Sequence, residues 1–120
     1  GDIPSYKVAE NDQFYAFLDI NPLVKGHTLV IPKKEVDKLF DLDEDTYLGL
    51  MAFAKYVSHG IEKSFECDRV AMSVIGLEVP HAHVHLVPIT TMSDIDFTRP
   101  KLQLEAEEMK SIADLISSNL

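Results

Sequence analysis

The sequence predicts an α+β fold in which an antiparallel sheet of about five short strands packs against two helices. Three observations carry this prediction. The strand candidates occur in groups and do not alternate with helices, a pattern typical of antiparallel meanders. One long amphipathic segment separates the groups, and a second helical segment closes the chain. The 120 residues are enough for one compact domain, so we expect a single domain over residues 1–120.

Three strands are predicted in the first third of the chain. Residues 6–9 alternate weakly between polar and apolar side chains, and residues 14–18 are rich in aromatic side chains, which favour strands. Residues 11–12 (ND) are a turn signal between them. Residues 27–31 form the third strand, which Pro32 ends because proline lacks the N–H group that a sheet uses.

The clearest helix covers about residues 43–65. Its apolar residues recur at steps of three and four, so they form one stripe along the helix. Asp43, Glu44 and Asp45 suit its N-terminus, where acidic side chains interact favourably with the helix dipole. The stripe comprises Tyr47, Leu50, Met51, Ala54, Val57, Ile61 and Phe65.

The second half of the chain predicts two more strands and a closing helix. The strands cover residues 69–75 and 81–88, and Gly76 between them permits a bulge or a close approach of the backbone. Residues 104–115 or beyond form the second helix, which is acidic at its start. Short strands leave an open sheet edge, so we expect the sheet to continue across a homodimer.

Composition and charge exclude several classes of protein. The net charge is −9, from twenty acidic and eleven basic residues. We therefore expect neither a nucleic-acid partner nor an anionic membrane surface, because both favour basic proteins. No stretch approaches the roughly 18–20 apolar residues of a membrane span, and no signal peptide is visible. The single Cys67 favours a cytoplasmic location, and the opening GDIP is typical of a chain that lacks a short N-terminal segment.

Three histidines alternate with small or apolar residues in residues 79–88 (VPHAHVHLVP). On a strand, His81, His83 and His85 share one face. Two histidines at this spacing make a good zinc pair. Three in a row span roughly 13 Å, too far for one ion, and neither His27 nor His59 lies in a ligand motif. We expect no metal and no required cofactor, with a zinc-dependent hydrolase as an alternative.

A phosphate site with a histidine nucleophile explains the same pattern better. An imidazole can attack phosphorus and form a covalent phosphoramidate. The ring must be neutral with Nε2 free, so that its Nδ1–H donates to another group, commonly a backbone carbonyl. Neighbouring imidazoles can donate to the phosphate oxygens and protonate the leaving group. His83 is flanked on both sides and is the predicted nucleophile.

The motif His81-x-His83-x-His85, followed by two apolar residues, resembles the signature of the histidine triad (HIT) superfamily. Residues 17–22 (FLDINP) and 26–34 (GHTLVIPKK) resemble the N-terminal block of that family. The likeness covers about residues 3–88 and is to the HINT-like branch of nucleotide phosphoramidases and nucleotidyl hydrolases. It implies an α+β fold, a homodimer with a continuous sheet, and a site for a purine nucleoside monophosphate such as AMP.

The resemblance also implies roles for individual residues. His83 carries the nucleotidyl group, His81 and His85 flank the phosphate, and His27 supports the triad. Asp19 matches the position that binds the ribose hydroxyls, which suits the two acceptor oxygens of a carboxylate.

The same resemblance places the base of the nucleotide against apolar side chains that come from the first strands. Phe17, together with Ile20 or Phe14, would line this base pocket.

The sequence departs from the family pattern just before the triad. Leu77 replaces a glutamine that would contact the phosphate or a bridging oxygen, and residues 72–75 lack the usual asparagine and glycines. Glu78 adds a negative charge, and Ser73 is a candidate for one missing polar contact. These changes disfavour dinucleoside polyphosphates as substrates. We predict a hydrolase of a purine nucleoside phosphoramidate that acts through nucleotidyl-His83; the alternative is a regulatory nucleotide-binding module with little catalysis.

Overall fold

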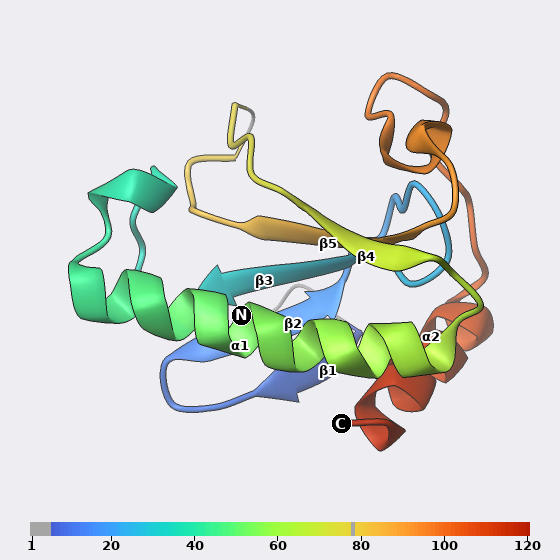
Figure 1. Ribbon diagram of the computed structural model, residues 1–120, viewed down its shortest axis with the longest axis horizontal. Helices are drawn as coiled ribbons and strands as arrows, with labels where there is room; N and C mark the ends of the chain where they lie inside the picture. The colour runs from blue at the N-terminus through green and yellow to red at the C-terminus, as the bar shows by residue number, and fades with distance from the viewer. Residues whose placement is uncertain (1–5, 78) are drawn as a thin grey trace.

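The computed structural model describes residues 6–77 and 79–120. Within them, five strands and two helices follow one another as the α+β prediction requires, joined by two short 3-10 helices (Figure 1). The elements are β1 (Lys7–Glu10), β2 (Phe14–Leu18), β3 (Thr28–Pro32), η1 (Leu39–Asp41), α1 (Glu44–Ser64), β4 (Arg69–Ser73), β5 (Val84–Ile89), η2 (Met92–Ile95) and α2 (Ala106–Ser118).

The five strands form one antiparallel sheet in the order β1-β2-β3-β5-β4. The triad strand β5 is therefore an inner strand of the sheet, between β3 and the edge strand β4. Thr28 of β3 pairs with Leu86 of β5, and Leu29 pairs with His85. This register brings the segment that carries His27 beside the triad, although 58 residues separate His27 and His85.

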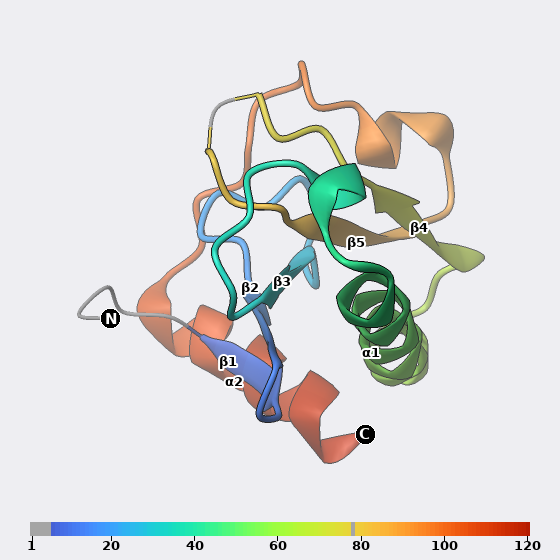
Figure 2. The same cartoon turned by 90° about the vertical axis from the view of Figure 1, so that its left-hand side faces the viewer.

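Both helices cover the same face of the sheet (Figure 2). Alternate residues of the strands point into this layer, as in β2, where Phe14, Ala16 and Leu18 are buried and the residues between them are half-exposed. The side chains of α1 and α2 complete the core; they are Leu50, Phe53, Ala54, Val57, Ile61, Met109, Ile112, Ala113 and Ile116. His85 alternates with Val84 and Leu86 of this core, so its ring emerges on the opposite face.

The long helix begins and ends close to the predicted positions. Asp43 is its N-cap, and the Asp43 carboxylate accepts the backbone N–H of Thr46 at 3.1 Å. Phe65 is its C-cap. Among the described residues, no helix is long and apolar enough to cross a membrane.

The predicted strand 81–88 is wrong at its start, and so is the predicted end of the strand before it. β5 begins only at Val84, and β4 ends at Ser73. His81 N–H instead donates to the Val79 carbonyl, and Ala82 N–H donates to the carbonyl of Val36. The segment that carries His81 and His83 is thus bent and bonded to the chain after β3, so the three histidines do not share one face of a regular strand.

Candidate active site

A pocket of about 620 Å³ opens on the sheet face that the helices leave free. The segment between β2 and β3 contributes Asp19, Asn21 and His27 to its walls, and β3 adds Leu29. His83 and His85 lie at the pocket as well. The remaining walls come from the loop after β4 and from the chain after η2: Ile75, Gly76, Leu77, Val79, Phe97 and Lys101.

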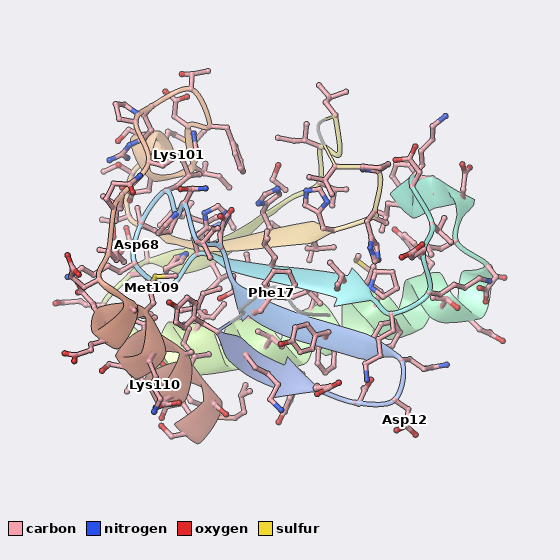
Figure 3. All side chains as sticks on the ribbon, turned by 180° about the vertical axis from the view of Figure 1, so that it is seen from behind. Asp12, Phe17, Asp68, Lys101, Met109 and Lys110 are labelled. Carbon is pink, nitrogen blue, oxygen red and sulfur yellow. The ribbon has the colours of Figure 1, made fainter. Side chains whose placement is uncertain are left out.

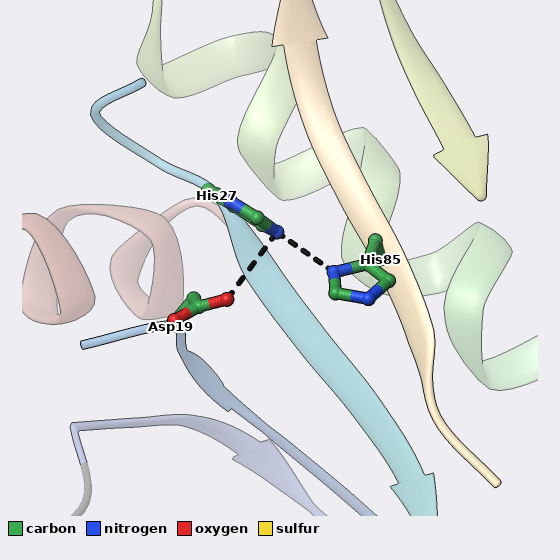
Figure 4. A group of neighbouring side chains, drawn as sticks. All are labelled: Asp19, His27 and His85. Atoms are coloured by element: carbon green, nitrogen blue, oxygen red, sulfur yellow. Dashed lines mark hydrogen bonds and ion pairs between the residues drawn. The ribbon is translucent and has the colours of Figure 1, made fainter. Parts of the chain in front are cut away.

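His27 and His85 form a buried hydrogen-bonded pair at this pocket (Figure 4). Their side chains are 1% and 8% exposed, and 2.9 Å separates His27 Nε2 from His85 Nδ1. The backbone N–H of Leu23 donates to His27 Nδ1 at 3.0 Å, so this nitrogen must be an acceptor. In the neutral ring the proton then lies on Nε2, which donates to His85 Nδ1. His85 in turn carries its proton on Nε2.

Burial keeps both rings of the pair neutral near pH 7. The pKa of His27 is lowered to about 4, mainly by burial and to a lesser degree by the charge of Lys101. The pKa of His85 is also lowered to about 4, first by burial and then by His27 and His83, while Asp19 opposes the shift. A second proton on either ring would place two donors face to face. On His85 it would meet the Nε2–H of His27, and on His27 it would meet the backbone N–H of Leu23.

His83 is held in the state that a nucleophile needs. Its Nδ1 lies 2.7 Å from the carbonyl oxygen of His81, which can only accept. The Nδ1–H therefore donates to that carbonyl, and Nε2 of the neutral ring keeps its lone pair. The His83 ring stands almost perpendicular to the His85 ring, with 4.9 Å between the ring centroids.

His81 does not line the pocket with the other two triad histidines. Its Nε2–H donates to the carbonyl oxygen of Pro32 at 2.8 Å, at the end of β3. The His81 side chain is thus hydrogen-bonded to β3, while the backbone carbonyl of His81 accepts the Nδ1–H of His83. Its predicted place beside the phosphate stays a prediction.

Asp19 approaches the histidine pair from the end of β2 (Figure 4). Asp19 Oδ2 lies 3.7 Å from His27 Nε2, and Oδ1 accepts the backbone N–H of Asn21 at 2.9 Å. Because His27 is neutral, this approach is a contact between a carboxylate and an imidazole and not an ion pair. The carboxylate also borders the pocket, where a ligand can reach it.

A metal ion could in principle be held by three neighbouring side chains, those of Asp19, His27 and His85. One ligand atom of each lies within 4.8 Å of the others. Two nitrogens on a tetrahedral zinc ion would lie about 3.3 Å apart, given zinc–nitrogen distances of about 2.0–2.1 Å. The nitrogens of His27 and His85 are only 2.9 Å apart and face each other as donor and acceptor. The pair is arranged as a hydrogen bond, which a metal would have to break.

None of the three side chains predicted for the base pocket lines the pocket found here. Phe14 lies in the core under the helices, 5.7 Å from the ring of Phe53, because it belongs to the buried set of β2 residues. Phe17, labelled in Figure 3, points to the other face. Its ring lies tilted against the Tyr15 ring, with 5.3 Å between the centroids. Ile20 is 60% exposed. Their roles toward a base stay predictions.

Phe97 and Lys101 line the pocket, and sequence reasoning missed both. They lie in the chain after η2, and Figure 3 shows Lys101 in the loop near one end of the sheet. The Phe97 ring meets the His85 ring edge-on at 4.8 Å and the His27 ring at 6.1 Å. No local pattern in residues 90–105 marks either residue, because only the tertiary fold brings this segment over the histidines.

The loop after β4 gives the pocket an apolar wall. Ile75, Leu77 and Val79 all line the pocket with exposed side chains, and Leu77 is 89% exposed. Ser73 lies at the end of β4, paired in register with His85, and does not line the pocket. Glu78 lies outside the described residues. The wall thus offers apolar side chains to a ligand. At position 77, where the family pattern has a glutamine, the side chain is a leucine without an amide.

A family model for the HIT domain matches residues 1–92. This chain belongs to the HIT family. A HIT-like protein of Borreliella burgdorferi is 35% identical over 127 residues, which cover 99% of this chain and 91% of that protein. An adenosine 5'-monophosphoramidase of Schizosaccharomyces pombe is 31% identical over 122 residues, which cover 100% of this chain and 92% of that protein.

A solved structure confirms the HIT fold. The crystal structure of a hypothetical histidine triad nucleotide-binding protein from Sulfolobus tokodaii matches this chain with a TM-score of 0.86 and 31% identity. The match covers 98% of this chain and 85% of that one. The family predicted from the two sequence blocks and the triad is therefore correct.

Proposed function

We propose that this HIT protein hydrolyses a purine nucleoside phosphoramidate through a covalent nucleotidyl-His83 intermediate. The observation that carries the proposal is the 2.7 Å hydrogen bond from His83 Nδ1 to the His81 carbonyl, which leaves Nε2 as the free lone pair beside the pocket. The name of the Schizosaccharomyces pombe relative, an adenosine 5'-monophosphoramidase, supports the same class of substrate.

In the first step, His83 Nε2 attacks the α-phosphorus and the P–N bond of the substrate breaks. The substrate nitrogen takes up a proton from solvent as the bond breaks and leaves as a neutral amine. The phosphorylated His83 ring, which is now cationic, keeps its Nδ1–H on the His81 carbonyl. The Nε2–H of His85 donates to a phosphate oxygen as the charge shifts. In the second step, water attacks the phosphorus and the Nε2–P bond breaks. AMP and one proton of the water leave, and His83 returns to its neutral form.

Two parts of the pocket lining suit different parts of the substrate. Asp19 offers carboxylate oxygens that suit ribose hydroxyls. The apolar wall of Ile75, Leu77 and Val79 suits a leaving amine with an apolar substituent better than a polyphosphate. We infer that phosphoramidates of apolar amines are better substrates than dinucleoside polyphosphates.

A homodimer, a cytoplasmic location and activity without a cofactor belong to the same proposal. Strand β4 is an edge of the sheet, and its residue Met72 is exposed, as is Tyr56 on α1. Such an edge with apolar neighbours favours pairing with a second copy.

Steady-state hydrolysis of an adenosine phosphoramidate tests the proposal with two matched variants. His83→Ala should lose at least about a thousandfold in kcat while AMP binding, measured by calorimetry, persists. His59→Ala removes an exposed histidine of α1, on the face away from the pocket, and should keep full activity. Wild-type protein that binds AMP without turnover would favour the regulatory module. Activity that EDTA abolishes in zinc-containing protein would favour the zinc-dependent hydrolase.

A further inference from the structure

The chain between η2 and α2 crosses the sheet face that carries the histidines. We call residues 96–102 the strap. Its Phe97 is the one residue of the strap whose ring contacts both imidazoles of the His27–His85 pair, edge-on at centroid distances of 6.1 and 4.8 Å. The interplanar angles of 82° and 73° place a ring edge against each histidine.

Two sets of hydrogen bonds fix the strap over the pair. Lys101 Nζ donates to the carbonyl oxygens of Phe97 at 2.6 Å and of Arg99 at 3.1 Å, which closes the strap on itself. The backbone N–H of Leu102 donates to the carbonyl of Pro22 at 2.8 Å, in the segment that leads to His27. The position of Phe97 is therefore set by the strap and by the loop that also carries one of the two histidines.

The phenyl ring of Phe97 packs beside the two imidazoles without forming hydrogen bonds to them, which a polar side chain would do. It fills the space beside the His27–His85 hydrogen bond without offering a competing donor or acceptor. Among the described residues, His27 makes the one hydrogen bond to the His85 ring, and the rings that pack against it are His27, His83 and Phe97. Packing against Phe97 then limits how far the His85 ring can rotate.

We propose that Phe97 is a positioning residue, which holds the His85 ring so that its Nε2–H points to the phosphate beside His83. This inference rests on the proposed function for the direction of the Nε2–H, while the packing itself does not depend on any substrate.

The groups that face His85 predict how the loss of Phe97 changes its titration. The titratable and charged groups that face the histidine pair are His27, His83, Asp19 and Lys101, and Phe97→Ala changes none of these residues. Water then reaches the imidazole, and burial is the main cause of its low pKa. The pKa of His85 should rise toward the ordinary value, by about one unit.

The test compares Phe97→Ala, Phe97→Leu and the control Phe40→Ala, which removes an exposed ring beside Tyr47. Imidazole NMR titrations of the ligand-free proteins should show the higher His85 pKa in Phe97→Ala only, with Phe97→Leu close to wild type. With an adenosine phosphoramidate, kcat of Phe97→Ala should fall about tenfold to a hundredfold while KM changes less than twofold.

Two results would overturn the inference. One is an unchanged His85 pKa and tautomer in Phe97→Ala, and the other is a raised KM with unchanged kcat, which would make Phe97 only a wall of the pocket. Thermal unfolding confirms that each variant is folded. If wild-type protein hydrolyses no phosphoramidate, the proposed function fails, and the NMR titration still decides whether Phe97 controls His85.

Discussion

The carbonyl oxygen of His81 lies 2.7 Å from Nδ1 of His83, so the first histidine of the triad sets the tautomer of the second through its backbone. The contact depends on the bent chain before Val84, where β5 begins. A regular strand would point this carbonyl toward a neighbouring strand instead. The departure from the strand thus makes the hydrogen bond on which the proposed attack of His83 on phosphorus depends.

The His27–His85 hydrogen bond predicts a loss of stability and activity in His27→Ala. The substitution removes the donor to His85 Nδ1 and leaves the Leu23 N–H and a buried imidazole nitrogen without their partner. The free energy of unfolding, measured in urea, should fall by about 2–4 kcal/mol. kcat should fall at least about tenfold. His59→Ala, which removes an exposed histidine of α1, is the control. Equal stability of the two variants would contradict a stabilising role of the His27–His85 pair.

The lowered pKa values of the pair predict that stability depends on pH between about 4 and 6.5. The unfolded imidazoles bind protons below pH 6.5, whereas those of the folded protein bind them only near pH 4. The unfolded state therefore holds more protons in this window, and the free energy of unfolding falls as the pH is lowered through it, by about 3 kcal/mol for each of the two rings. Below pH 4 this contribution no longer changes.

Urea denaturation between pH 4 and pH 7 measures this slope directly. His27→Gln, which removes one of the two buried imidazoles, should flatten the slope, whereas His59→Gln should leave it as in wild type. An equal slope in wild type and His27→Gln would show that other groups cause the acid sensitivity.

Leu77 predicts the choice of leaving group. Wild-type protein should have a much higher kcat/KM for an adenosine phosphoramidate of an apolar amine than for a diadenosine polyphosphate. Leu77→Gln restores an amide donor at the pocket wall and should raise hydrolysis of the polyphosphate by about tenfold. Val79→Gln, on the same wall, is the control. A gain of the same size in both variants would show that polarity alone, and not position 77, limits this reaction.

The exposed edge strand predicts a homodimer in solution. Sedimentation of wild-type protein should give the mass of two chains, and Met72→Lys should shift it toward one, because the charge would lie on the pairing edge. Met92→Lys places the same charge on the exposed η2 and should leave the dimer intact. A wild-type monomer at micromolar concentration would contradict the proposal.

Local patterns predicted the elements that local physics determines. Strand 14–18 matches β2 residue for residue, because aromatic side chains and period-two burial coincide there. Asp43 and the acidic residues of the first turn predicted where α1 begins, because helix capping acts within one turn. The start of β5 was missed because the bend depends on the distant bond between Ala82 and Val36. Phe97 was missed for the same reason, as its partners lie far away in the sequence.

The residues of the site divide in the same way. The spacing of the triad and the segment around His27 identified histidines that the structure brings together, as the 2.9 Å bond between His27 and His85 shows. The contacts that distinguish one histidine from another come from other segments, such as the Pro32 carbonyl at His81 and the Phe97 ring at His85. Aromatic residues were predicted to line the base pocket. Phe14 instead faces the core, because it is one of the alternate residues of β2 that point to the helices.

Intact-mass spectrometry after brief mixing with an adenosine phosphoramidate tests the central claim most directly. The reaction is quenched in base, which preserves P–N bonds, and His83→Ala is run in parallel. We expect that wild-type protein gains the mass of one AMP moiety and that the variant gains none. AMP release at the wild-type rate by His83→Ala, or an AMP adduct on that variant, would contradict it.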